Sequence, residues 1–206
     1  MILFFDFDGT IIENRARYHR VHAHCLGKTP AVLSETEYWE LKRSRIPEKE
    51  ILRRHYPNVD CARYQREREL VIESTEFLAF DTLLPGAHET LRTLKANHTL
   101  ILVTLRKNSK TAMREIQSFG LHELCSDIRI AAAGKDPVAK KIELIRHDCD
   151  PSSWVIGDTE ADILAGKALH LTTCGVLSGI RKKECLQMLN PTHLVTSIGE
   201  LLSLLR

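Results

Sequence analysis

The sequence lacks long apolar runs, and no part of its 206 residues approaches the roughly 18 consecutive apolar side chains of a transmembrane segment. It also lacks a basic segment ahead of its first apolar run, Ile2 to Phe5, which is followed at once by the acidic residues Asp6 and Asp8. Such a beginning is not that of a cleavable signal sequence. We therefore expect a cytoplasmic protein with no membrane partner.

Cysteine pairs and an excess of one charge are absent too. No two of the six cysteines form a C-x-x-C pair, and their wide spacing favours isolated reduced thiols over a disulfide framework. Lysine and arginine number 29 against 27 acidic residues, a net charge of +2, which does not call for a nucleic acid polymer as partner. With 43% hydrophobic and 27% charged residues the chain has ordinary globular composition, which excludes a disordered or collagen-like protein.

The order of apolar patterns predicts the fold class. Residues 2–7 have the pattern of a buried strand, whereas residues 14–81 lack β-branched runs and carry helix signals, such as the capping box of Ser34 and Glu37. Asp60 is expected to cap one long helix toward Phe80, with a buried stripe of Leu70, Val71, Phe77 and Leu78. From residue 82 onward strands and helices alternate, which is typical of a doubly wound parallel α/β sheet. We predict a core of residues 1–13 and 82–206 with an inserted helical unit of residues 14–81.

Polar side chains gather where the predicted parallel strands end. Ligands of such sheets bind beyond the carboxyl ends of the strands. Four strand ends together supply one hydroxyl, one lysine and four carboxylates, namely Asp6, Asp8, Thr104, Lys135, Asp158 and Asp162. Carboxylates this close repel one another unless they take up protons or bind a cation, and oxygen ligands alone favour Mg²⁺ over zinc. Thr104 and Lys135 can donate to an oxyanion, so the set predicts phosphoryl transfer.

The same segments resemble the motifs of the haloacid dehalogenase-like superfamily. Residues 6–10 match its D-x-D-G-T motif, and the later motifs resemble Val103-Thr104, Gly134-Lys135 and Gly157-Asp158-x-x-x-Asp162, in the family's order. The inserted unit is similar in place to the helical cap of phosphoglycolate phosphatases and related sugar-phosphate phosphatases. The resemblance implies a Rossmann-like core with a cap, an aspartyl-phosphate formed on Asp6, and Asp8 as general acid and then base. It also implies Mg²⁺ held by Asp6, the Asp8 backbone carbonyl and Asp158, with Asp162 ligating through water or orienting.

Some assignments stay open at this stage. The family's third motif usually has Pro directly after Lys, but here Asp136 intervenes, so Lys140 and Lys141 rival Lys135; we favour Lys135 because the rivals lie inside a helical pattern. Arg106, where many relatives carry Asn nearby, is a candidate for substrate binding. Cations of the helical unit, Arg17 and Arg45, are further candidates.

The predicted function is a Mg²⁺-dependent phosphatase that acts on a small phosphorylated metabolite, as a monomer or homodimer. A phosphomutase of the same superfamily is the nearest alternative, separated by product analysis with a hexose 1-phosphate. A non-enzymatic receiver domain also uses clustered Asp, Thr and Lys, but it carries its phosphate acceptor on a later strand and has no inserted helical unit. A binding module without catalysis would lack a motif residue, and none is missing.

Overall fold

A computed structural model describes residues 1–28, 31–132 and 134–205 as two compact units. One unit combines residues 1–13 with residues 82–206, and the other is Asn14–Asp81. We call them the core unit and the helical unit and describe each by itself. None of the helices in these residues has the length and apolar character needed to cross a membrane.

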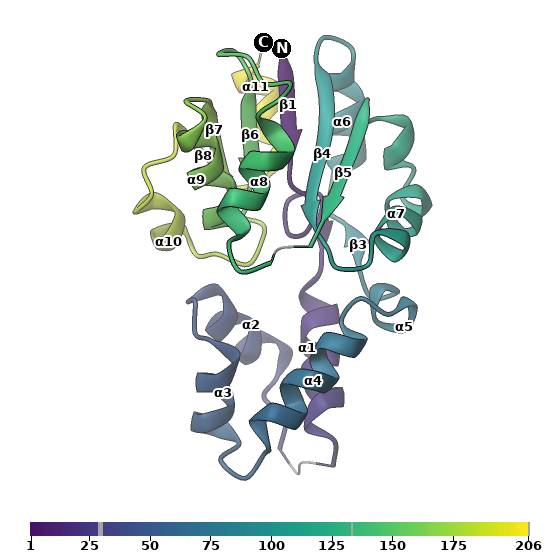
Figure 1. Ribbon diagram of the computed structural model, residues 1–206, viewed down its shortest axis with the longest axis vertical. Coiled ribbons are helices and arrows are strands. Elements are labelled where there is room, and N and C mark those ends of the chain that lie inside the picture. Colours follow the sequence, from purple (N-terminus) through teal and green to yellow (C-terminus); the bar gives the residue numbers. More distant parts are fainter. Residues whose placement is uncertain (29–30, 133, 206) are drawn as a thin grey trace. The chain divides into compact units, whose positions relative to one another are not determined.

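The core unit is built on a six-stranded parallel sheet in the order β5-β4-β1-β6-β7-β8 (Figure 1). Its strands are β1 (Ile2–Phe5), β4 (Thr99–Leu105), β5 (Asp127–Ala131), β6 (Trp154–Gly157), β7 (Thr172–Val176) and β8 (His193–Val195). Two short segments, β2 (Ile12–Glu13) and β3 (Thr82–Leu83), pair antiparallel where the chain leaves the core unit and returns to it. The first strand lies inside the sheet between β4 and β6, so the predicted doubly wound fold is confirmed.

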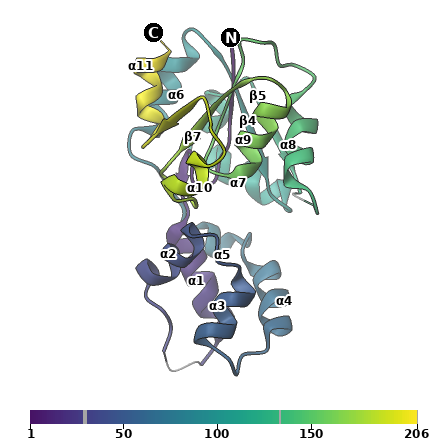
Figure 2. The same ribbon diagram turned by 90° about the vertical axis from the view of Figure 1, so that its left-hand side faces the viewer.

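Helices cover both faces of this sheet (Figure 2). The helices and short 3-10 turns of the core unit are α6 (Ala87–Lys95), α7 (Ser109–Ser118), η1 (Leu121–Glu123), α8 (Pro137–Ile145), α9 (Glu160–Ala168), α10 (Lys183–Gln187), η2 (Ile198–Glu200) and α11 (Leu201–Leu204). Figure 2 shows α6 and α11 on one side of the strands, with α8 and α9 on the other.

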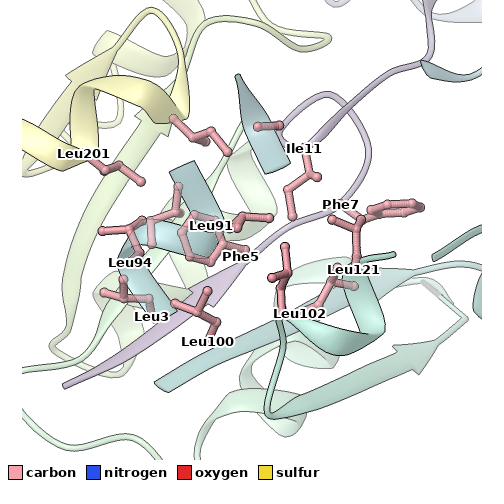
Figure 3. Close-up of a cluster of buried hydrophobic side chains, with 14 of the residues drawn as sticks. Leu3, Phe5, Phe7, Ile11, Leu91, Leu94, Leu100, Leu102, Leu121 and Leu201 are labelled. Atoms are coloured by element: carbon pink, nitrogen blue, oxygen red, sulfur yellow. The ribbon is translucent and has the colours of Figure 1, made fainter. Parts of the chain in front are cut away.

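Side-chain alternation along β1 assigns each residue to one of the two faces. Leu3 and Phe5 belong to the cluster that also holds Leu91 of α6 and Leu201 of α11 (Figure 3). Phe4 points to the opposite face, in the cluster that holds Ile145 of α8. Beyond the strand, Phe7 belongs to the first cluster again, so Asp6 lies on the face of the sheet that α8 covers. A side chain of α8 can therefore contact Asp6.

The helical unit consists of α1 (Arg15–Leu26), α2 (Glu35–Arg43), α3 (Glu48–His55), α4 (Cys61–Val71) and α5 (Thr75–Leu78). The capping box of Ser34 and Glu37 begins α2 as predicted. The single long helix expected from Asp60 toward Phe80 was wrong. Asp60 does cap α4, but the chain turns after Val71, and Ser74 begins the separate α5. Leu70, expected in the buried stripe of that single helix, is 76% exposed.

A buried polar cluster lies inside the helical unit, centred on Glu48. Its carboxylate accepts hydrogen bonds from the hydroxyls of Tyr64 at 2.7 Å and Tyr38 at 3.0 Å, and pairs with Lys42 at 2.9 Å. His22 Nδ1 lies 2.7 Å from the Tyr64 hydroxyl, and its ring stacks on Tyr38 with centroids 4.2 Å apart. Because the cluster joins α1, α2, α3 and α4, we call it the Glu48 network.

Candidate active site

Three carboxylates meet at the carboxyl edge of the sheet. Asp6 and Asp158 follow the neighbouring strands β1 and β6, and the Asp6 amide still donates to the Ile156 carbonyl at 2.8 Å. Asp162 lies in the first turn of α9, directly after that edge. One carboxylate oxygen from each of the three lies within 4.8 Å of the others, and all three residues are buried. The strand ends thus bring together positions separated by more than 150 residues of chain.

Lys141 is the cation of this cluster. Its Nζ lies 2.5 Å from Asp6 Oδ1 and 2.7 Å from Asp162 Oδ1, and it donates to the Val103 carbonyl at 2.9 Å. Its side chain is 3% exposed. Lys141 is one turn inside α8, on the same buried face as Ile145 four residues later, and that face covers the side of the sheet to which Asp6 points.

The structure places Lys141 beside the carboxylates, whereas the sequence favoured Lys135. Lys135 is exposed in the segment before α8, whose first turn is capped by Asp136, and Lys140 is engaged with Glu143 at 2.6 Å. We expected a lysine within a helix to lie away from the site. That expectation neglected the reach of the lysine side chain, whose four methylenes carry its charge from the buried face of α8 to the sheet edge.

Burial and like charge act on the protonation of these groups. Burial is the largest influence on Asp6 and, with the charge of Asp162, raises its pKa to about 7 against the lowering effect of Lys141. Burial and the charges of Asp6 and Asp162 likewise raise the pKa of Asp158 well above its ordinary range. Burial alone would lower the pKa of Lys141, but the carboxylates of Asp162 and Asp6 outweigh it and raise that pKa. One ammonium does not offset three buried carboxylates, so the cluster favours a further positive charge.

Asp158 offers an oxygen suited to a cation. Its Oδ2 accepts a 2.6 Å hydrogen bond from the Ile180 amide, whereas the buried Oδ1 has no hydrogen-bond partner among the described residues. The carboxylate is closely enclosed, because a Cβ on Gly179 would lie 1.8 Å from Oδ2 and one on Gly9 would lie 2.5 Å from it. A fixed, unpartnered carboxylate oxygen beside two further carboxylates matches the all-oxygen ligand set of Mg²⁺.

Asp162 serves its own helix as well as the cluster. Its Oδ2 accepts from the Thr159 amide at 3.1 Å and the Thr159 hydroxyl at 2.6 Å, which forms the capping box of α9. Its Oδ1 faces Lys141. A Cβ on Gly157 would lie 2.2 Å from the Asp162 carboxyl carbon, so only glycine permits this approach. Asp162 thus caps α9 with one oxygen and faces Lys141 with the other, and its predicted part in holding a metal stays a prediction.

Asp8 and Arg106 form a separate pair beside the cluster. Arg106 Nε lies 2.6 Å from Asp8 Oδ2, and Nη2 lies 2.7 Å from Asp8 Oδ1. The Asp8 side chain is 23% exposed, unlike the carboxylates of the buried cluster. Arg106, predicted to bind substrate, thus directs two of its nitrogens at a predicted catalytic residue. Thr104 is buried near the end of β4, and its predicted contact with a phosphoryl group stays a prediction.

The two cations of the helical unit differ from each other. Arg17 is buried, and its Nε lies 3.3 Å from Asp81 Oδ1, so an ion pair joins the beginning and the end of the unit. Arg45 is exposed in the turn after α2, where its φ of 63° is in the left-handed region. The contacts described within the helical unit do not test whether either arginine binds substrate. These two assignments stay predictions.

Sequence reasoning missed the loop after β7. The Ile180 amide holds Asp158, the Ser178 hydroxyl donates to the Gly9 carbonyl at 2.8 Å, and Gly179 leaves room for Asp158. The available signal was the position of Ser178-Gly179 just after a predicted parallel strand, the same logic that identified the other strand ends.

Comparison with known proteins agrees with this architecture. Residues 1–170 match the family model described as haloacid dehalogenase-like hydrolase. The chain is 26% identical to a phosphoglycolate phosphatase of Psychrobacter arcticus, over 93% of this chain and 90% of that protein. It is 25% identical to the pyrophosphatase PpaX of Halalkalibacterium halodurans, over 58% of each chain.

A solved structure shares the fold over the whole chain. The crystal structure of a putative phosphatase from Clostridium difficile has a TM-score of 0.78 at 17% identity, covering 100% of this chain and 98% of that one. The family match over residues 1–170 confirms the resemblance drawn from the four motifs. The chain therefore belongs to the haloacid dehalogenase-like hydrolases and is similar to the phosphoglycolate phosphatases among them.

Proposed function

We propose that the protein is a Mg²⁺-dependent phosphatase that hydrolyses a small phosphorylated metabolite in the cytoplasm through an aspartyl-phosphate on Asp6. The observation that carries the proposal is the buried cluster of Asp6, Asp158 and Asp162 around Lys141 at the carboxyl edge of the sheet. A buried carboxylate beside an ammonium is suited to act as a nucleophile toward an electrophile that itself carries negative charge.

Two bond exchanges make up the proposed reaction. First, an oxygen of Asp6 forms a bond to phosphorus while the bond from phosphorus to the leaving oxygen breaks, and Asp8 gives its proton to that oxygen. Second, a water molecule attacks the phosphorus of the aspartyl-phosphate, Asp8 takes a proton from this water, and the Asp6 carboxylate leaves with the bonding electrons. The outcome is inorganic phosphate and an alcohol, with Asp6 and Asp8 restored.

Lys141 and Thr104 support the transferring group in this proposal. Lys141 keeps one oxygen of Asp6 fixed through its 2.5 Å contact, which leaves the other oxygen of the carboxylate to attack. Its charge also offsets the negative charge that the phosphoryl oxygens bring into a buried site. The hydroxyl of Thr104 is a donor for one of these oxygens.

The residues that would hold Mg²⁺ are Asp6, the Asp8 backbone carbonyl and Asp158, with Asp162 held by its hydrogen bonds from Thr159. The unpartnered Oδ1 of Asp158 supports this assignment. When bound, Mg²⁺ would neutralise charge on the carboxylates and on the phosphoryl oxygens. The raised pKa of Asp6 supports the same view, because its carboxylate needs a second cation beside Lys141 to be fully ionised at neutral pH.

The substrate class is proposed as phosphoglycolate-like or sugar-phosphate-like. Support comes from the phosphoglycolate phosphatase of Psychrobacter arcticus, which is similar over nearly the whole chain. In this proposal residues 14–81 act as a cap that selects the leaving group, while the core unit handles the phosphoryl group.

A panel of phosphate esters tests the function. We expect phosphate release from 2-phosphoglycolate, hexose phosphates or para-nitrophenyl phosphate with Mg²⁺, loss of release in excess chelator, and recovery when Mg²⁺ is restored. Asp6→Asn should retain less than about 1% of kcat, a loss of at least about 3 kcal/mol in transition-state stabilisation, because its amide cannot form the phosphoenzyme.

The panel also has outcomes that contradict the proposal. Full activity in chelator would refute the metal requirement. Hexose 6-phosphate formed from hexose 1-phosphate, in place of free phosphate, would make the protein a phosphomutase.

A further inference from the structure

Arg106 holds Asp8 by a two-point contact. Its Nε and Nη2 lie 2.6 and 2.7 Å from the two oxygens of the Asp8 carboxylate. A planar guanidinium that meets both oxygens fixes the plane of a carboxylate as well as its distance. The contact joins residues 98 positions apart in sequence, so it depends on the folded core unit and not on a local turn.

Arg106 is itself held by its surroundings. Its Nη2 lies 3.3 Å from Glu115 Oε2 on α7, and its Cζ lies 5.7 Å from the ring centroid of Phe7. Phe7 is fully buried and stands between Asp6 and Asp8 in sequence. The Arg106 side chain is only 4% exposed. A long side chain so enclosed has few other rotamers, and it can therefore impose an orientation on the partly exposed Asp8.

The Asp8 carboxylate needs a fixed orientation because a cluster of carboxylates suited to a cation lies nearby. The three carboxylates that gather within 4.8 Å of one another are Asp6, Asp158 and Asp162, and Asp8 is not among them. In the proposed function Asp8 must reach the leaving oxygen, and a carboxylate free to turn could instead approach the bound cation. The guanidinium gives the Asp8 carboxylate a positive partner other than that cation.

We propose that Arg106 is a positioning residue, which holds the Asp8 carboxylate toward the leaving group, and that Glu115 holds Arg106 in turn. The inference rests on the proposed function, because it assumes that Asp8 transfers the proton. The two-point contact is that of the ionised carboxylate, and one of its two hydrogen bonds gives way when an Asp8 oxygen carries the proton. It replaces the substrate contact expected for Arg106 from the sequence. The two roles differ in a measurable way. Loss of a phosphate contact lowers kcat/KM for every phosphate ester alike. Loss of Asp8 orientation lowers kcat/KM most for the esters whose leaving group needs a proton.

The test is the leaving-group dependence of Arg106→Lys. This variant keeps the positive charge near Asp8 and Glu115 but cannot present two parallel donors. We would measure kcat/KM for a series of substituted phenyl phosphates, from para-nitrophenyl phosphate to unsubstituted phenyl phosphate. We expect a loss of about 10²-fold for phenyl phosphate and of less than about tenfold for para-nitrophenyl phosphate, within the range of general acid catalysis.

Three further variants complete the experiment. Arg106→Met should make kcat/KM depend more steeply on the leaving group than Arg106→Lys does. Lys107→Met removes the neighbouring exposed cation and should leave the dependence of the wild type unchanged. Asp8→Asn gives the limit expected when no proton is donated. Circular dichroism of each variant measures the amount of folded protein. A loss of folded protein would lower kcat/KM equally for all esters, unlike a loss of Asp8 orientation.

The outcomes distinguish the inference from the proposed function. A steep dependence in Asp8→Asn and in both Arg106 variants supports the inference. A steep dependence in Asp8→Asn alone, with parallel losses in the Arg106 variants, overturns it while the proposed function stands. An unchanged dependence in Asp8→Asn, in an active enzyme, refutes the acid role of Asp8, and the inference fails with it.

Discussion

Lys141→Met should lower kcat for phosphate esters by about 10³-fold, the scale of losing one strong donor from a buried charged site. The reason is the position of its Nζ, 2.5 Å from Asp6 and 2.7 Å from Asp162. Without this charge, Asp6 loses a fixed orientation and the site gains one uncompensated negative charge. The measurement is steady-state phosphate release at saturating Mg²⁺, with thermal unfolding run in parallel to confirm a folded variant.

Two matched lysine variants serve as controls for this result. Lys140→Met makes the same substitution one residue earlier on α8, where the side chain pairs with Glu143 at the surface. Lys135→Met tests the position favoured from the sequence. Both should retain activity close to that of the wild type. Loss of turnover in Lys135→Met together with activity in Lys141→Met would restore the original assignment and contradict the site described above.

Glu48→Gln should lower the free energy of unfolding by about 3 kcal/mol at pH 7, since it removes one charged partner from a largely buried network. The Glu48 side chain is 12% exposed and contacts Lys42, Tyr38 and Tyr64. Glutamine keeps the shape but turns two donor hydrogens toward groups that themselves donate. The measurement is urea unfolding followed by circular dichroism.

The difference in the free energy of unfolding between the wild type and Glu48→Gln should also depend on pH. Burial would raise the pKa of Glu48, but the His22 hydrogen bond and the charges of Lys42 and Arg68 outweigh it and hold the pKa well below the ordinary 4.5. A depressed folded-state pKa contributes stability that is complete above the unfolded value and is lost as pH falls below it. The gap between wild type and Glu48→Gln should therefore narrow from pH 7 to pH 4.

Glu50→Gln is the control on the same helix, because Glu50 pairs only with the exposed arginines Arg53 and Arg54 in the contacts seen. It should change stability little. The network would not stabilise the ionised carboxylate if Glu48→Gln had the same free energy of unfolding as the wild type at pH 7. A difference that grows toward pH 4 would mean the same.

The fold was predictable because its pattern is long and regular. Alternating strands and helices after residue 82 specify a parallel sheet, and the contrast with residues 14–81 marks the inserted unit. The break between α4 and α5 was not predictable from apolar spacing. Leu70, Val71, Phe77 and Leu78 repeat at seven residues, yet the turn at Ser74 resets the helical phase between the two pairs.

The acidic part of the site was predictable for a topological reason. Asp6 and Asp158 directly follow strands, and the carboxyl ends of parallel strands share one edge. Lys141 comes from a helix, where position relative to the edge depends on which face is buried. Its place four residues before the apolar Ile145 was the signal, because a lysine on a buried helical face requires a buried partner.

The hydrogen-bonded contact between Arg106 and Asp8 was not predictable from the sequence. Arg106 follows the end of β4 and Asp8 follows β1, so their neighbourhood could be foreseen from the strand order. Their mutual contact could not, because an arginine at a strand end can equally turn to solvent or to a ligand. The packing of Phe7 and the position of Glu115 on α7 decide the outcome.

Trapping the phosphoenzyme tests the central claim most directly. Wild type and Asp8→Asn would be mixed with para-nitrophenyl phosphate and Mg²⁺, quenched in acid and analysed by peptide mass spectrometry. We predict one phosphoryl group on Asp6, more abundant in Asp8→Asn because its hydrolysis lacks a base, and none in Asp6→Asn. Steady phosphate release without an adduct in either protein, or an adduct on a peptide that lacks Asp6, would contradict the account.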